Sequence, residues 1–176
     1  PALIEVPEFN CLMVDGQGRP EEQGFEQAAS TLYPIVYTLK HAYKALKPEK
    51  DFTVMPMEVI WRLDRSIKRF EWSMLLVLPD FITRDDFFTT IEQVRRKFNP
   101  PLLDSTRLER HQEGLCVQMM HLGPYDGMND TLAKMRSFAA EKGLKIALDT
   151  HDIYLNSILR TQPKNLRTIM RAVVLD

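Results

Sequence analysis

Hydrophobic residues along the chain follow two different spacings, which separate strands from helices. Compact or alternating apolar runs predict six strands, at residues 9–14, 52–62, 70–78, 115–122, 152–156 and 168–175. Apolar positions three and four apart predict three helices, over residues 25–46, 83–98 and 128–139. The charged stretch 104–112 has room for one more short strand.

Turn and capping residues punctuate these elements. Pro34 interrupts the first helix, so we expect either a kink or a second helix that begins at Pro34. Thr83 and Asp86 have the spacing of a capping box, and Gly143 is placed to end the third helix. Residues 63–68 and 157–167 are expected to be loops between strands.

The order strand–helix–strand–strand occurs twice along the chain. We therefore predict a single domain over 1–176, with module one at about 8–80, a connecting helix at about 83–98 and module two at about 113–176. The fold class is α+β, with tandem duplicated strand–helix–strand–strand modules and antiparallel sheets. A pseudo-twofold cleft between the modules is the expected ligand site.

Charge and hydrophobic-run length exclude some classes of binding partner and location. The 176 residues contain 23 basic and 24 acidic side chains, a balance that argues against nucleic acid or an anionic membrane surface as partner. The longest strictly apolar run, Met74 to Leu78, is far shorter than the ~20 residues of a membrane span. The N-terminus lacks the features of a signal peptide, so the cytoplasm is the expected location. The composition leaves the oligomeric state open.

Cysteine and histidine give little support for a cofactor. Cys11 and Cys116 lie in predicted strands and are expected to be buried reduced thiols, with a disulfide as the alternative. The four histidines show no metal-ligand spacing. We predict no metal and no other cofactor.

The last predicted hairpin carries the most suggestive polar residues. Alternation puts Ile153 and Leu155 on one face of their strand and Asp152 and Tyr154 on the other. If the apolar pair faces the helices, the carboxylate and the phenol face the cleft. There Asp152 is a candidate counter-ion for a cationic ligand or a general base, unless it only bonds a neighbouring loop.

Other candidates combine aromatic, acidic and sulfur side chains. Glu58 near Trp61, and Trp72 on the next strand, suit flat cationic molecules, although each tryptophan also fits a core. Met55 could line an adaptable pocket or fill a core. Tyr125 follows a strand at a Gly-Pro turn, where it could cap the cleft or pack. His121 precedes that turn and fits either a ligand site or a satisfied structural histidine.

Five strings, in order, resemble the GyrI-like small-molecule-binding family, in its stand-alone branch without a DNA-binding domain. They are Met55-Pro56-Met57-Glu58-Val59-Ile60-Trp61, Phe70-x-Trp72-Ser73-Met74 with Leu78-Pro79-Asp80-Phe81-Ile82-Thr83, Glu113-Gly114-x-Cys116-Val117-Gln118-Met119-Met120-His121-Leu122-Gly123-Pro124-Tyr125, His151-Asp152-Ile153-Tyr154-Leu155 and Leu166-Arg167-Thr168-Ile169-Met170-Arg171.

The resemblance implies two modules of the SHS2 type around a ligand cleft. Relatives include effector-binding domains of multidrug-responsive transcription regulators, a DNA gyrase inhibitor, and hydrolases that open the cyclopropane ring of DNA-alkylating natural products. Where relatives usually carry a glutamate in a pattern resembling His-x-Ile-Tyr-Leu, this chain has the shorter Asp152. After Tyr125, relatives commonly carry a glutamate, whereas this chain reads Asp126-Gly127-Met128-Asn129.

Three hypotheses follow for function. The first is a small-molecule-binding protein that senses or sequesters an amphipathic aromatic or cationic compound. Its recognition set is Trp61, Tyr125, Asp152, Tyr154 and Glu58, with Trp72, Met55 and His121 as further candidates. The second is a hydrolase of strained cyclopropanes, with Asp152 acting on water and Tyr125 or Tyr154 as proton donor. The third is a protein-binding modulator of a DNA enzyme such as gyrase.

Overall fold

A computed structural model describes residues 1–64, 69–157 and 160–175 of the chain. The chain groups into two compact units. Unit 1 contains Pro1–Glu8, Pro56–Leu63 and Gln112–Asp176, and unit 2 contains Phe9–Met55 and Asp64–His111. Three helices and antiparallel strand pairs confirm the predicted α+β class.

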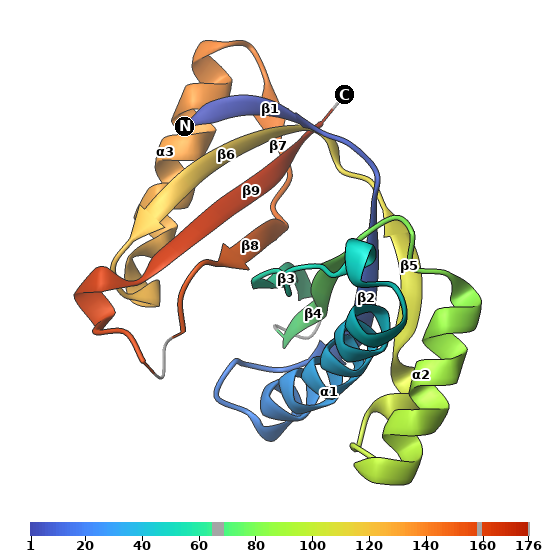
Figure 1. Cartoon of the computed structure of the whole chain (residues 1–176). Coiled ribbons are helices and arrows are strands. Elements are labelled where there is room, and N and C mark those ends of the chain that lie inside the picture. Colours follow the sequence, from blue (N-terminus) through green and yellow to red (C-terminus); the bar gives the residue numbers. More distant parts are fainter. Residues whose placement is uncertain (65–68, 158–159, 176) are drawn as a thin grey trace. The chain divides into compact units, whose positions relative to one another are not determined.

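Unit 1 is built on five strands in the order β1 (Ala2–Val6), β6 (Gly114–Leu122), β9 (Arg167–Leu175), β8 (Thr150–Tyr154) and β3 (Met57–Asp64). The two-residue β7 (Lys145–Ile146) pairs with the end of β9. Helix α3 (Met128–Glu141) lies along β6 and β9 (Figure 1). The short turns η3 (Tyr125–Gly127) and η4 (Pro163–Asn165) precede α3 and β9.

The core of unit 1 lies between α3 and one face of its sheet. Met135 and Ala139 of α3 pack against Val117, Met170 and Ala172 of β6 and β9. The register pairs Val117 with Ala172 and Met119 with Met170, so these side chains share one face. Gly143, at a φ of 72°, ends α3 in the left-handed conformation, as its position predicted.

Unit 2 pairs β4 (Arg69–Leu78) with β2 (Phe9–Gln17), and β2 with β5 (Arg107–His111). Helix α1 (Gln23–Leu46) packs on β2, and α2 (Arg84–Lys97) packs beside α1 (Figure 1). Two short turns, η1 (Pro48–Lys50) and η2 (Leu103–Ser105), follow these helices. The short strand that the 104–112 segment had room for is β5.

Helix α1 is one continuous helix with Pro34 inside it, so the alternative of a second helix beginning at Pro34 is wrong. Its buried face runs without a break from Ala28 to Tyr43. This packing on both sides of Pro34 outweighs the single backbone hydrogen bond that a proline removes. The capping box of α2 is confirmed, since Thr83 and Asp86 bond each other's backbone amides.

The start of one predicted strand differs from the structure, and parts of two predicted loops lie outside the described residues. The strand predicted over 52–62 begins only at Met57, because Phe52 is buried in an aromatic group with Tyr43 and Phe81. The loop predicted over 63–68 falls largely on residues 65–68, which lie outside the described residues. Residues 158 and 159 of the second predicted loop lie outside them too.

Both cysteines are buried thiols. Burial raises the pKa of the Cys116 thiol to about 11, with the Glu113 charge as the next cause. A thiol with so high a pKa is a poor nucleophile at neutral pH. Cys116 therefore behaves as a small core residue.

Candidate functional site

Strand β8 carries two different sets of side chains on its two faces. Register with β9 pairs Asp152 with Met170 and His151 with Arg171. Because paired residues share a face and neighbours along a strand alternate, Asp152 lies with Met170 and His151 lies opposite. Met170 belongs to the core under α3, so the Asp152 face is the helix side of the sheet.

The conditional expectation that Ile153 and Leu155 face the helices is therefore not met. Ile153 pairs with Ile169 and with Glu58, on the face away from α3. Asp152 and Tyr154 share the other face, toward the side that α3 covers. Both sides of β8 carry buried residues, so hydrophobicity alone does not tell which face the helix covers.

Four side chains gather on the helix side of unit 1, and we call them the Asp152 cluster: Trp61, Tyr125, Asp152 and Tyr154. Trp61 lies on β3, where it pairs with Thr150 and so shares the Asp152 face. Its indole Nε1 donates a hydrogen bond of 3.1 Å to the Tyr154 hydroxyl. The ring of Tyr125 meets that of Tyr154 edge to face, with centroids 5.6 Å apart.

Asp152 is the one acidic residue of this cluster, and it is buried, with 4% of its surface exposed. Its Oδ1 atom has no hydrogen-bond partner among the described residues. Burial raises the pKa of Asp152 to about 7, although the nearby His151 charge and Thr150 act to lower it. The carboxyl group therefore exchanges its proton near neutral pH.

The two phenols beside Asp152 stay protonated at neutral pH. Burial, and then the Asp152 charge, raises the pKa of Tyr125. The same two causes raise the pKa of Tyr154 well above its usual value, against the Trp61 hydrogen bond, which lowers it. Because the Tyr154 oxygen already accepts from Trp61, its own proton remains available for donation. The cluster thus combines a titrating carboxyl with hydroxyl donors.

His121 lies on β6, and both of its ring nitrogens are engaged within unit 1. Nε2 lies 2.9 Å from the Pro124 carbonyl oxygen, which can only accept, so Nε2 carries a proton. Nδ1 lies 2.9 Å from the Thr131 hydroxyl on α3. His121 thereby ties the turn that presents Tyr125 to the helix, and it leaves no ring nitrogen for a ligand.

Glu58 lies on the opposite face from Trp61, which corrects its place in the predicted recognition set. It pairs with Ile153, and its carboxylate forms an ion pair of 2.8 Å with Nε2 of His151. Trp61 is three positions after Glu58 along β3, and an odd difference in position puts two side chains on opposite faces of a strand. Glu58 therefore belongs with His151 and not with the Asp152 cluster.

Behind the Asp152 cluster, on the far face of the sheet, lies a buried network of charges that the sequence did not reveal. We call it the His151 network: Glu58, Glu113, Gln118, His151 and Arg171. Nδ1 of His151 lies 3.0 Å from one Glu113 oxygen, and the Arg171 guanidinium donates to the other at 2.5 Å. Arg171 also donates to Oε1 of Gln118 at 3.1 Å and 3.3 Å.

The His151 network holds equal numbers of positive and negative groups. Burial lowers the pKa of His151, but Glu113 and Glu58 outweigh burial and raise it to about 9. Burial raises the pKa of Glu113, but His151 and Arg171 outweigh it and lower the value below the ordinary one. At neutral pH two carboxylates therefore face one imidazolium and one guanidinium, and the network compensates its own charge.

Trp72 and Met55, the remaining predicted site residues, belong to unit 2. Trp72 is 1% exposed and meets Phe25 edge to face, with ring centroids 5.3 Å apart. Its ring occupies the space above Gly16, where a Cβ atom would overlap the indole. This is the core position that was the alternative for Trp72. Met55 is 43% exposed, just before β3.

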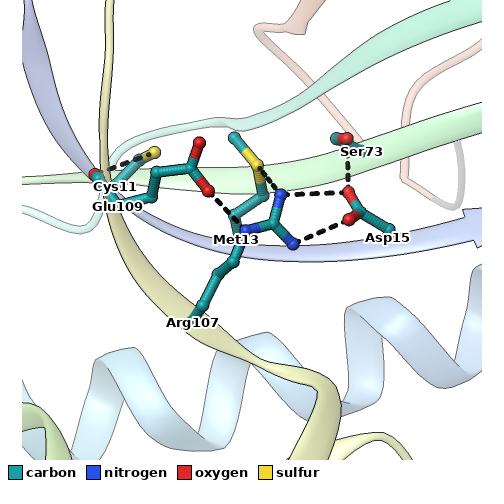
Figure 2. A network of polar contacts seen from close by, with 6 residues as sticks. All are labelled: Cys11, Met13, Asp15, Ser73, Arg107 and Glu109. Atoms are coloured by element: carbon teal, nitrogen blue, oxygen red, sulfur yellow. Dashed lines mark hydrogen bonds and ion pairs between the residues drawn. The ribbon is translucent and has the colours of Figure 1, made fainter.

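Unit 2 has a polar network of its own, centred on Arg107 (Figure 2). The guanidinium donates to both oxygens of Asp15, at 2.8 Å and 3.2 Å, and also contacts Glu109 and the Met13 sulfur. Ser73 donates to Asp15 at 2.5 Å. These polar groups satisfy one another, which indicates a role in holding β2, β4 and β5 together.

Two kinds of feature were sought and not found in the described part of the chain. Residues 1–64, 69–157 and 160–175 contain no group of three or more histidine, cysteine, aspartate or glutamate side chains that could hold a metal ion. None of their helices is long and apolar enough to cross a membrane.

Neither the known family profiles nor the curated proteins gave a match to this chain. Solved structures did. A protein from Listeria innocua described as a hydrolase is 36% identical, with a TM-score of 0.89, over 99% of this chain and 91% of that one. An uncharacterized conserved protein from Listeria innocua is 34% identical, with a TM-score of 0.92 and the same coverage.

A more distant structure shares the fold alone. SAV2435, solved bound to tetraphenylphosphonium, is 7% identical, with a TM-score of 0.51, over 99% of this chain and 93% of that one. The identity is too low to carry residue roles from one protein to the other.

Proposed function

The chain belongs to the family of these two Listeria innocua proteins, and from that premise we propose that it binds a small organic cation at the Asp152 cluster. The five sequence strings support naming this family GyrI-like. Tetraphenylphosphonium, the ligand of the distant structure SAV2435, is such a cation, with one positive charge surrounded by aromatic rings. The proposal takes the ligand to be aromatic or amphipathic and singly charged.

The observation that carries this proposal is the buried Asp152 carboxyl, whose Oδ1 lacks a partner among the described residues. An ionised carboxylate that is buried with one unpaired oxygen is unfavourable, so a cation that reaches this oxygen forms a strong interaction with it. The rings of Trp61, Tyr125 and Tyr154 offer faces for stacking and cation–π contact. The acids of the His151 network are already paired with His151 and Arg171, so Asp152 is the acidic group that a bound cation would pair with.

Calorimetric titration with two ions of the same shape and opposite charge tests the proposal. Tetraphenylphosphonium should bind, and tetraphenylborate should bind at least ~10-fold more weakly, the equivalent of 1.4 kcal/mol. Asp152→Asn should lower the affinity for tetraphenylphosphonium by a similar factor. The matched control is Asp149→Asn, which removes the same charge from an exposed position three residues away. Equal affinity of wild type and Asp152→Asn for the cation would refute the proposal.

The pH dependence of the titration provides a second test. A cation binds the ionised carboxylate, and the pKa of Asp152 is raised to about 7. The affinity should therefore rise as the pH increases from 5 to 7 and level off above 8. In Asp152→Asn the affinity should be independent of pH over the same interval.

Hydrolysis is the second candidate function, and the titration of Asp152 near neutrality favours it. A base whose pKa lies near the working pH is suited to remove a proton from water. Tyr125 and Tyr154, protonated at that pH, can donate to an oxygen that gains negative charge. The 36% identical protein from Listeria innocua is described as a hydrolase.

For a cyclopropane conjugated to a carbonyl, the step balances as follows. Water attacks a ring carbon and gives its proton to Asp152, a carbon–carbon bond of the ring breaks, and the electron pair moves to the carbonyl oxygen. A phenol of Tyr125 or Tyr154 protonates that oxygen, and the proton that Asp152 took from water then returns to the phenolate. Turnover of a cyclopropane-containing alkylator should rise with pH through about 7 and be abolished in Asp152→Asn, while binding of the neutral substrate survives. Unchanged turnover in that variant would remove Asp152 from the reaction.

A further inference from the structure

The His151 network surrounds one imidazole with acids, and this geometry fixes its charge. Nε2 lies 2.8 Å from Glu58 and Nδ1 lies 3.0 Å from Glu113. Two carboxylates at ion-pair distance, one beside each ring nitrogen, favour the imidazolium form in which both nitrogens carry protons. His151 is thus held as an imidazolium, with 3% of its side chain exposed.

This imidazolium is the next residue along β8 from Asp152. Consecutive Cα atoms are about 3.8 Å apart, and the two side chains leave the strand on opposite faces. Both residues are buried, so salt and water screen their attraction poorly. A fixed positive charge therefore lies behind the carboxyl group.

The other groups around each residue do not supply that charge. On its own face Asp152 has Thr150, Tyr125, Tyr154 and Trp61, which are neutral at pH 7. On the far face, Glu58 of β3 and Glu113 next to β6 are negative, and Arg171 of β9 is committed to Glu113 and Gln118. His151 is the positive group adjacent to Asp152 in the chain.

We propose that His151 is a positioning residue for the Asp152 cluster: its fixed charge, held by Glu58 and Glu113, stabilises the ionised form of Asp152 from the opposite face of β8. The inference rests on the proposed function in treating Asp152 as the site residue. It adds that His151, Glu58 and Glu113, on the opposite face of the sheet, control the ionisation of Asp152 and thereby its use as a cation receptor or as a base.

The experiment measures the ionisation of Asp152 in the ligand-free protein, from the pH dependence of its side-chain carboxyl carbon signal in NMR spectra. In His151→Gln the pKa of Asp152 should rise by about one unit, because the nearby positive charge is lost. In Glu58→Gln it should not rise, because the amide oxygen still accepts from His151 and Glu113 still holds the imidazolium charged. A change of less than about 0.2 unit in His151→Gln overturns the proposal.

His151→Gln leaves two buried acids without their partner and can fail to fold. The double variant His151→Gln/Glu58→Gln removes one charge of each sign, and its comparison with Glu58→Gln isolates the effect of the imidazolium. The same upward change in the pKa of Asp152 is expected, and no change overturns the proposal. A purely structural role of His151 would alter the unfolding midpoint and leave the pKa of Asp152 where it is.

Failure of this inference and failure of the proposed function give different results. If no cation binds but the pKa of Asp152 rises in His151→Gln, the coupling stands and the proposed ligand is wrong. If the cation binds through Asp152 but the pKa is unchanged, the function stands and the role of His151 is overturned.

Discussion

The Trp61 indole donates its N–H to the Tyr154 hydroxyl over 3.1 Å, joining β3 to β8 on the face that carries Asp152. The chain has two tryptophans, and the other, Trp72, is 1% exposed. A ligand at the Asp152 cluster should therefore change the fluorescence of Trp61. This relationship gives each tryptophan a separate experimental signature.

Trp61→Phe should abolish the fluorescence change on adding tetraphenylphosphonium and weaken its binding about 3- to 10-fold, because the smaller ring offers less stacking and cation–π energy. The matched control is Trp72→Phe, which should keep both the fluorescence change and the affinity. A signal lost in Trp72→Phe and kept in Trp61→Phe would contradict the assignment of the site to unit 1.

Trp72→Phe should instead lower stability. The indole packs on Phe25 and fills the space above Gly16, so a smaller ring leaves a cavity. We expect a loss of about 2 kcal/mol in the free energy of unfolding, measured by urea denaturation. A loss below about 0.5 kcal/mol would show that the core closes around the smaller side chain.

Asp152→Asn should stabilise the protein at pH 8 and not at pH 4. In the folded state the pKa of Asp152 is about 7, against an ordinary value of 3.8, so the folded state keeps the proton to higher pH. Stability must then fall as the pH rises from about 4 to about 7, by three pKa units, on the order of 4 kcal/mol. Burying the asparagine amide without a full set of hydrogen bonds lowers the stability of Asp152→Asn by about 1–3 kcal/mol at every pH.

The measurement is urea unfolding of wild type and Asp152→Asn at several pH values. The variant should be about 1–3 kcal/mol more stable than wild type at pH 8, and the stability difference between the two should change by on the order of 4 kcal/mol between pH 4 and pH 8. A difference that stays constant with pH would show that the pKa of Asp152 is not raised in the folded state, in conflict with its burial and its unpaired Oδ1.

His151 should stabilise the folded state most at low pH. Its folded pKa of about 9 exceeds the ordinary 6.5, so its contribution is complete below pH 6.5 and is lost as the pH rises through 9. The shift corresponds to on the order of 3 kcal/mol. The stability difference between wild type and His151→Gln/Glu58→Gln should therefore shrink between pH 6.5 and pH 9. A difference that grows with pH would reverse the sign of the argument.

Arg107→Gln should cost about 1 kcal/mol, because Asp15 and Glu109 lose a cation that is 38% exposed and partly screened by solvent. Arg110→Gln on the same strand is the control. Its ion pair with Asp80 is more exposed, so the expected loss is below about 0.5 kcal/mol. Equal losses would show that the contacts to Ser73 and Met13 add nothing to the Arg107 network.

The element order could be predicted from sequence because the apolar spacing is strong in β2, α1, β4, α2, β6, α3 and β9. Strand β1 was missed: its residues are mostly exposed and it is held by pairing with β6, which local patterns do not register. The predicted strand at β3 began too early because Phe52 was counted as its first apolar residue. Phe52 instead packs on the rings of Tyr43 and Phe81.

The candidate site could be predicted only in part, because facing depends on register. Asp152, Tyr154, Tyr125 and Trp61 were predicted from aromatic and acidic residues on or beside strands, and these four side chains lie together in unit 1. Glu58 was grouped with Trp61 because the alternation rule was applied to β8 and not to β3, where it puts the two side chains on opposite faces. The His151 network escaped notice because Glu113 and Arg171 are distant in sequence from His151 and are brought to it by the pairing of β9 with β8 and with β6.

The adjacency of His151 and Asp152 on β8 also limits how this protein can change during evolution. A single-residue insertion or deletion at the start of β8 would shift its register by one position and exchange the two faces. The imidazole would then enter the aromatic cluster, and the carboxyl group would join two other acids. Single substitutions in β8 keep this arrangement of faces, whereas a residue inserted or deleted within the strand does not, unless a second change elsewhere restores the register.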